Sequence, residues 1–93
     1  MIALSNSEIQ QLINELPNWE LKDGFLCTTI VCADFKTAFA LMTRIAFEAE
    51  ALTHHPNWEN VYNTIHIKLR THDANGITQN DFDLANRIES LRS

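Results

Sequence analysis

The sequence has few basic residues and few glycines, and each scarcity excludes a class of protein. Its 93 residues include 7 Lys and Arg against 12 Asp and Glu, for a net charge of -5. A nucleic-acid binder needs a surplus of cations on one face, so we expect no nucleic-acid partner. The 2 glycines, Gly24 and Gly76, cannot build a Gly-rich phosphate loop, and no GxSxG nucleophile motif is present.

Long apolar runs and closely spaced cysteines are also missing. No stretch approaches the roughly 18 to 20 apolar residues of a membrane span, and residues 1–7 lack a basic segment followed by an apolar one. We therefore expect a cytoplasmic protein with no membrane partner. Cys27 and Cys32 are the only cysteines, and their spacing fits neither a zinc ribbon nor a redox motif. We expect both to be reduced packing residues.

What is present fits one small domain covering residues 1–93. The hydrophobic fraction of 45% supplies one core, but a chain of this length buries only roughly two-thirds of its unfolded surface. Association with further copies of the chain would bury more of that surface. We therefore expect a homo-oligomer, a dimer or a tetramer, that uses the apolar surface of the first helix and the edges of the sheet.

Two segments in the first half carry helical signals. Ser5 and Glu8 have the spacing of a capping box, and the apolar periodicity after them predicts a helix over residues 6–15. Asp34 caps a second, longer helix that reaches about Thr53, with one apolar stripe along it. That stripe consists of Phe35, Ala38, Phe39, Met42, Ile45, Ala46, Ala49 and Leu52.

Strand signals occur in two pairs, one on either side of the second helix. The first pair covers residues 19–21 and 25–31, and Asp23-Gly24 between them suits a two-residue primed turn. The second pair covers residues 58–62 and 65–69, where apolar and polar side chains alternate.

A last helix begins after Thr78, which can cap its free N–H groups. Asp81 lies in its first turn, where a carboxylate complements the helix dipole. The order of elements is therefore α-β-β-α-β-β-α. We expect an α+β two-layer sandwich in which the helices cover one face of a four-stranded antiparallel sheet.

The histidines are the main chemical signal, because all 4 lie between positions 54 and 72. Imidazole titrates near pH 6.5, so a pair of histidines can hold one proton donor and one acceptor at neutral pH. Pro56 disfavours helical geometry at His55, which leaves His54 and His55 at a helix end. His72 lies where a strand gives way to a Gly-containing loop. His66 alternates with isoleucines and is expected to be an ordinary outward-facing strand residue.

Each of these residues also has a structural explanation. Glu50, four residues before His54, either orients that imidazole or is a solvated carboxylate at a helix end. The double histidine itself can interact with the negative end of the helix dipole. His54, His55, His72 and Asp73 are all metal-ligand types, but adjacent side chains diverge, so we expect no metal site.

A longer motif surrounds these histidines. Residues 48–58 read Glu-Ala-Glu-Ala-Leu-Thr-His-His-Pro-Asn-Trp, and the matching residues that follow are Val61-Tyr62-Asn63, Ile67-Lys68-Leu69-Arg70-Thr71-His72, Gly76, Asp81, Leu84 and Ala85. This string resembles the signature of the pterin-4a-carbinolamine dehydratases, also called 4a-hydroxytetrahydrobiopterin dehydratases. The resemblance covers nearly the whole chain.

The resemblance implies the same α-β-β-α-β-β-α fold and a hydro-lyase that uses no cofactor and no metal. Family members convert 4a-hydroxytetrahydropterin to quinonoid dihydropterin and water, and so recycle tetrahydrobiopterin. The catalytic histidines fall on His54, His55 and His72, with His54 and His72 as the proton-transfer pair and His55 mainly binding the pterin substrate. The implied substrate-binding residues are Trp19, Glu50, Thr53, Arg70, Thr71, Asp73 and Asp81.

Two positions depart from the family pattern, and a second function has to be weighed. Thr53 replaces a common acidic residue and Arg70 replaces a small hydroxyl residue, which bears on substrate preference. Some family members also serve as dimerisation cofactors of a homeodomain transcription factor, so the competing hypothesis is a protein-binding module. The three retained histidines favour the enzyme, because a scaffold has no chemical need for them.

Overall fold

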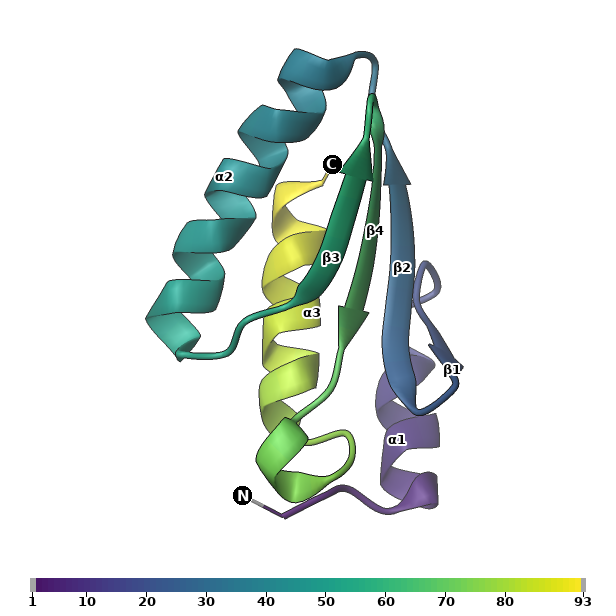
Figure 1. The fold of residues 1–93 in the computed structure, drawn as a ribbon. Helices are drawn as coiled ribbons and strands as arrows, with labels where there is room; N and C mark the ends of the chain where they lie inside the picture. Colours follow the sequence, from purple (N-terminus) through teal and green to yellow (C-terminus); the bar gives the residue numbers. More distant parts are fainter. Residues whose placement is uncertain (1, 93) are drawn as a thin grey trace.

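The computed structural model describes residues 2–92 (Figure 1); Met1 and Ser93, the ends of the expected domain, lie outside the described residues. Helices and strands follow one another in the predicted order. The helices are α1 (Asn6–Ile13), α2 (Phe35–Leu52) and α3 (Gln79–Leu91), and a 3-10 turn, η1 (His72–Ala74), precedes α3. The strands are β1 (Glu20–Lys22), β2 (Phe25–Val31), β3 (Asn57–Val61) and β4 (Thr64–Leu69).

The four strands form one antiparallel sheet in the order β1-β2-β4-β3. Figure 1 shows α2 and α3 side by side against one face of this sheet, which confirms the expected two-layer sandwich. Ile65, Ile67 and Leu69 of the central strand β4 are fully buried under these helices. The residues that alternate with them, His66 and Lys68, point to the uncovered face.

The caps of α1 and α2 are those that the sequence predicts. Ser5 Oγ accepts the backbone N–H of Glu8, and the Glu8 carboxylate accepts the backbone N–H of Ser5, which lowers the pKa of Glu8. The carboxylate of Asp34 accepts the N–H of Thr37 at 2.8 Å, and this bond lowers the pKa of Asp34. Helix α1 ends two residues early, because Asn14 and Glu15 form a turn before Pro17.

The predicted apolar stripe of α2 is partly wrong. Ala38, Ile45 and Ala49 are buried as expected, but Phe35 and Phe39 are 48% and 56% exposed. Leu41, which the prediction left out, is buried instead. The apolar band on this helix is wider than the surface that β4 and α3 cover, so its outer edge faces solvent.

The cysteines are free, as expected, and both are half-buried. Cys27 lies on the uncovered face of the sheet, where burial raises the pKa of its thiol. Cys32 packs against the core on the other side. Within residues 2–92, no helix is long and apolar enough to cross a membrane.

Candidate active site

A reversal of the backbone at the end of α2 places the two adjacent histidines in different surroundings. Thr53 has φ 50° and ψ 43°, and the N–H of His54 returns to the carbonyl of Ala49 at 2.9 Å. The left-handed conformation disfavours a residue with a β-branched side chain by about 1–2 kcal/mol, so the surrounding packing must hold it. The reversal turns His54 inward, where its side chain is 10% exposed, and leaves that of His55 outside at 63%.

The buried carboxylate of Asp81 is the partner of His54. His54 Nε2 lies 2.5 Å from Asp81 Oδ1, and Asp81 is fully buried at the start of α3. The other oxygen, Oδ2, accepts the hydroxyl of Thr71 at 2.9 Å and the backbone N–H of Thr78 at 2.8 Å. Three donors from three different segments therefore satisfy one buried carboxylate, as a group removed from water requires.

The acceptors in this network determine which atoms carry the hydrogens. A carboxylate only accepts, so Nε2 of His54 carries a proton and Nδ1 is the nitrogen left to exchange one. Thr71 donates its hydroxyl hydrogen to Asp81, so the contact of 2.6 Å between Thr71 and Thr78 requires Thr78 to donate. The network thus holds the His54 ring in one orientation and one tautomer.

The spacing of four residues suggested that Glu50 orients His54, but the two side chains do not pair. Oε2 of Glu50 instead accepts Nε2 of His55 at 2.9 Å, because the chain leaves the helix at Thr53. Both side chains of this pair are largely exposed, at 77% for Glu50 and 63% for His55. The two adjacent imidazoles therefore have the same type of partner in opposite environments.

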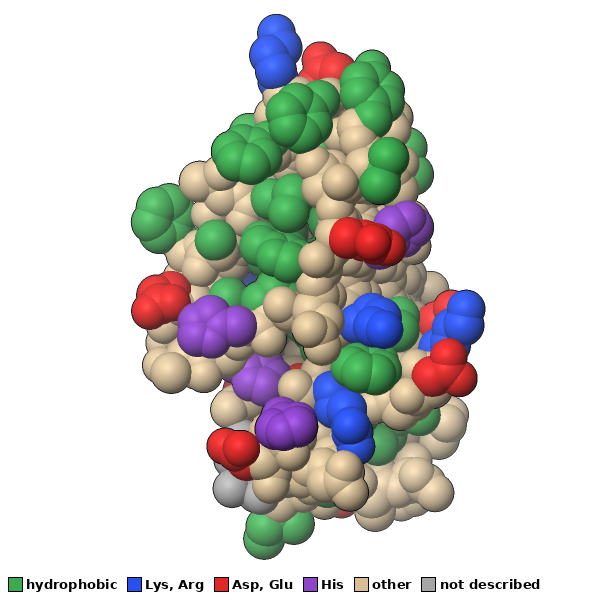
Figure 2. All heavy atoms as spheres, in the orientation of Figure 1, with side chains coloured by type: hydrophobic (Ala, Val, Ile, Leu, Met, Phe, Trp, Pro, Cys, Tyr) green, Lys and Arg blue, Asp and Glu red, His purple; other side chains and the backbone are tan. Residues whose placement is uncertain are grey.

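The third histidine begins η1, directly after Thr71. His72 and Asp73 are both exposed, and the strand β4 ends at Leu69, as predicted, so two residues separate it from His72. Thr71 turns inward to Asp81, whereas His72 directly after it is exposed. Figure 2 shows histidine side chains gathered on the lower part of one face, with basic side chains beside them.

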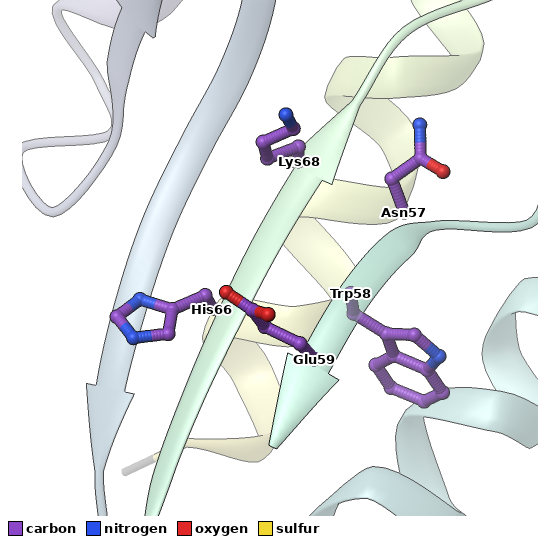
Figure 3. Close-up of a pocket in the computed structure, with 5 residues that line it drawn as sticks. All are labelled: Asn57, Trp58, Glu59, His66 and Lys68. Carbon is purple, nitrogen blue, oxygen red and sulfur yellow. The ribbon is translucent and has the colours of Figure 1, made fainter. Parts of the chain in front are cut away.

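Two residues considered at the sequence level lie apart from this network. Trp19 is 5% exposed in the core, and its indole N–H donates to Glu89 near the end of α3. His66 faces outward from β4, as predicted, with Nδ1 3.0 Å from the hydroxyl of Thr29. It lines a groove of about 370 Å³ on the edge of the sheet, where Glu59 lies beside it and Trp58 points toward the helices (Figure 3).

The role of Thr78 was not predicted beyond its function as a helix cap. Its spacing to Asp81 is that of a capping box, but the link from that box to an imidazole 27 residues away in sequence depends on the tertiary fold. Among residues 2–92, no three His, Cys, Asp or Glu side chains are grouped so that they could hold a metal ion.

Residues 2–91 match the family model described as pterin 4 alpha carbinolamine dehydratase. The chain belongs to this family. A protein of Christiangramia forsetii whose name places it among the pterin-4-alpha-carbinolamine dehydratases is 48% identical over 98% of this chain and 94% of its own length. A similarly named protein of Solibacter usitatus is 49% identical over 95% and 93%.

A solved structure agrees with the fold of this family member. The transcriptional coactivator/pterin dehydratase of Brucella melitensis superposes with a TM-score of 0.95 at 33% identity. The match covers 98% of this chain and 99% of that one, so the whole α+β sandwich is shared.

The two His–carboxylate pairs should differ sharply in their effect on stability. Asp81→Ala leaves three buried donors without an acceptor, and each unpaired buried group costs about 1–3 kcal/mol, so we expect the unfolding free energy to fall by at least about 3 kcal/mol. The matched variant Glu50→Ala breaks an exposed pair and should cost less than about 1 kcal/mol. Urea denaturation of both variants measures the difference, and equal losses would contradict this account of the network.

Proposed function

We propose that this protein is a pterin-4a-carbinolamine dehydratase that converts 4a-hydroxytetrahydropterin to quinonoid dihydropterin and water. The observation that carries the proposal is the imidazole of His54 bound to a buried carboxylate, in a chain that belongs to this family. The names of its relatives support the same reaction. We place the reaction in tetrahydrobiopterin recycling, as the sequence resemblance implies, and in the cytoplasm, as the lack of a long apolar run in the sequence led us to expect.

The reaction requires one acid and one base. The bond from C4a to the hydroxyl oxygen breaks with its electron pair on oxygen, and a proton from the acid lets that oxygen leave as water. The lone pair of a ring nitrogen forms the new double bond to C4a, and the base removes the proton of that nitrogen. Positioned proton transfer of this kind accelerates reactions by roughly 10²- to 10⁴-fold.

We assign the base to His54 and the acid to His72. A carboxylate at Nε2 stabilises the imidazolium that forms when Nδ1 takes a proton, which supports His54 as the base. His72 is exposed, so its imidazole can exchange protons with solvent between turnovers. His55, oriented by Glu50, is assigned mainly to substrate binding.

The remaining candidates divide by their surroundings. Thr53 and Asp73 are exposed next to the histidines and keep their assignment as substrate contacts. Thr71 and Asp81 use their polar atoms on one another, which supports a positioning role for both. The buried hydrogen bond of Trp19 favours a structural role for that side chain.

Steady-state kinetics on chemically generated 4a-hydroxytetrahydropterin test the reaction and the roles together. Wild type should accelerate dehydration, and His54→Ala and His72→Ala should each lower kcat by about 10²-fold or more, because each removes a proton-transfer group. His55→Ala should mainly raise KM.

His66→Ala is the control, since that imidazole lies on the outward face of β4 and takes no part in the proposed chemistry. Circular dichroism verifies that every variant is folded. A folded His66→Ala as impaired as His72→Ala would contradict the assignment, and a wild type without acceleration would refute the dehydratase.

Chelation provides an independent prediction. The proposed acid and base are both imidazoles, so activity should survive exhaustive treatment with a chelator. The rate is measured before and after treatment, and again with zinc added back. Loss of activity that zinc restores would show that a metal ion takes part.

A protein-binding role is the second candidate function, and exposed aromatic side chains favour it. Phe35, Phe39 and Phe47 on α2 are 48%, 56% and 71% exposed, and Figure 2 shows hydrophobic side chains gathered on the upper part of the molecule. The Brucella melitensis relative is named a transcriptional coactivator as well as a dehydratase. A partner bound on α2 would not require the histidines, so histidine variants separate the two functions.

We also propose self-association, although on a different surface from the one first expected. The apolar residues of α1 pack against the core, whereas the phenylalanines of α2 remain uncovered. Light scattering should give a mass of at least a dimer at micromolar concentration, and Phe39→Glu should lower it by placing a charge in the contact. A monomeric mass for the wild type would rule the proposal out.

A further inference from the structure

The guanidinium of Arg70, two residues before His72, has hydrogen-bond donors that the protein leaves unused. Its Nη2 donates to Oδ1 of Asn75 at 2.6 Å, but its buried Nε–H has no acceptor among residues 2–92. Buried donors are almost always paired, so an unpaired one requires an explanation such as a missing water, ion or ligand. Among the residues that the structure describes, 2–92, no carboxylate forms an ion pair with Arg70.

Arg70 lines a groove of about 260 Å³ at the lower end of the sheet. Asn75 and Gly24 line it too, and Gly24 brings no side chain into the space. Asn75 uses its Oδ1 to accept from Arg70, so the two N–H donors of its amide remain for a ligand. Most of the other lining residues are apolar, and none is a carboxylate, so the polar groups that the groove offers an anion are those of Arg70, Asn75 and Asn6.

A second cation, Lys68, does not line this groove but lies against the same aromatic ring as Arg70. Lys68 Nζ is 4.4 Å from the centroid of the Phe25 ring, and Arg70 Cζ is 5.9 Å from it, so one aromatic ring holds both cations on the uncovered face. Neither cation has an acidic partner within residues 2–92, in a chain whose net charge is -5. Figure 2 shows basic side chains beside the gathered histidines.

We propose that Arg70, with Asn75 and Lys68, forms a subsite for an anionic group on the side chain of the pterin. The inference rests on the proposed dehydratase function and names its substrate class: 4a-hydroxytetrahydropterins whose side chain ends in phosphate or carboxylate. A guanidinium binds either group through parallel N–H···O bonds. The Cα atoms of Arg70 and His72 are roughly 7 Å apart in extended chain, and the proposal places the pterin ring at His72 and the anionic group of its side chain at Arg70.

A purely structural role for Arg70 makes a different prediction. Its bond to Asn75 closes the turn that carries His72, so loss of Arg70 could displace that imidazole. Such a displacement would slow the dehydration of every pterin by the same factor. An anion subsite would instead change the ratio of rates between charged and neutral substrates.

The test compares kcat/KM for two substrates that differ in one group. These are the 4a-hydroxy derivatives of 6-hydroxymethyltetrahydropterin and of its phosphate monoester, with the 6-carboxy analogue as a third probe to separate phosphate from carboxylate recognition. Wild type should prefer an anionic substrate by at least about tenfold at low salt, and the preference should shrink as ionic strength screens the charges. Arg70→Ser should abolish the preference and Lys68→Gln should reduce it.

Arg44→Gln is the matched control, because it removes an exposed cation on α2 far from the groove in sequence and should leave the preference unchanged. Equal kcat/KM for all three substrates in wild type, or a preference that persists in Arg70→Ser, would overturn the subsite. If Arg70→Ser does not fold, Arg70→Lys and Lys68→Gln decide, since Lys loses the bidentate geometry.

A failure of the dehydratase proposal itself would be seen separately, as no turnover of any substrate. Equilibrium dialysis with the stable oxidised pair, 6-hydroxymethylpterin and its phosphate, then decides whether wild type binds the phosphate more tightly than Arg70→Ser does. Equal binding by the two proteins would exclude the subsite.

Discussion

The carboxylate of Asp81 is the interaction on which the site depends. It joins the end of α2, through His54, to the segment after β4, through Thr71, and to the start of α3, through the N–H of Thr78. Burying a charge costs several kcal/mol unless its hydrogen bonds are complete, so these three donors must be in place together. The folding of the domain and the placement of the His54 imidazole are consequently coupled at one residue.

The left-handed turn at Thr53 is the second constraint. Without it, the double histidine would continue α2 and both side chains would follow the helical spacing that pairs Glu50 with His54. The turn sends the first imidazole into the protein and leaves the second in solvent. The same residue type thus acquires two environments at two adjacent positions, and the base and the binding group that we propose differ in this respect.

Local signals in the sequence were sufficient for the elements but not for the contacts among them. The capping residues Ser5 and Asp34 and the alternation around Ile65 and Ile67 predict helices and strands that the structure confirms, because each depends on neighbours a few residues away. The exposed Phe35 and Phe39 were assigned to the core because periodicity does not reveal how wide a surface the other layer covers.

In the candidate site, too, local sequence signals do not predict the contacts between distant residues. Family resemblance singles out His54 and Asp81, but only the tertiary fold brings them within a hydrogen bond. The link from Thr78 through Thr71 to Asp81 was likewise invisible, because each threonine already had a local explanation.

The division between inward and outward side chains also explains how stability and specificity can vary independently here. Thr71 points inward and belongs to the Asp81 network, so replacing it disturbs buried hydrogen bonds. Its neighbours Arg70 and His72 form no hydrogen bond to Asp81, so a change at Arg70 leaves the three bonds of that carboxylate in place. The departure from the family pattern at Arg70, which the sequence resemblance implies, therefore bears on the proposed anion subsite rather than on the buried network.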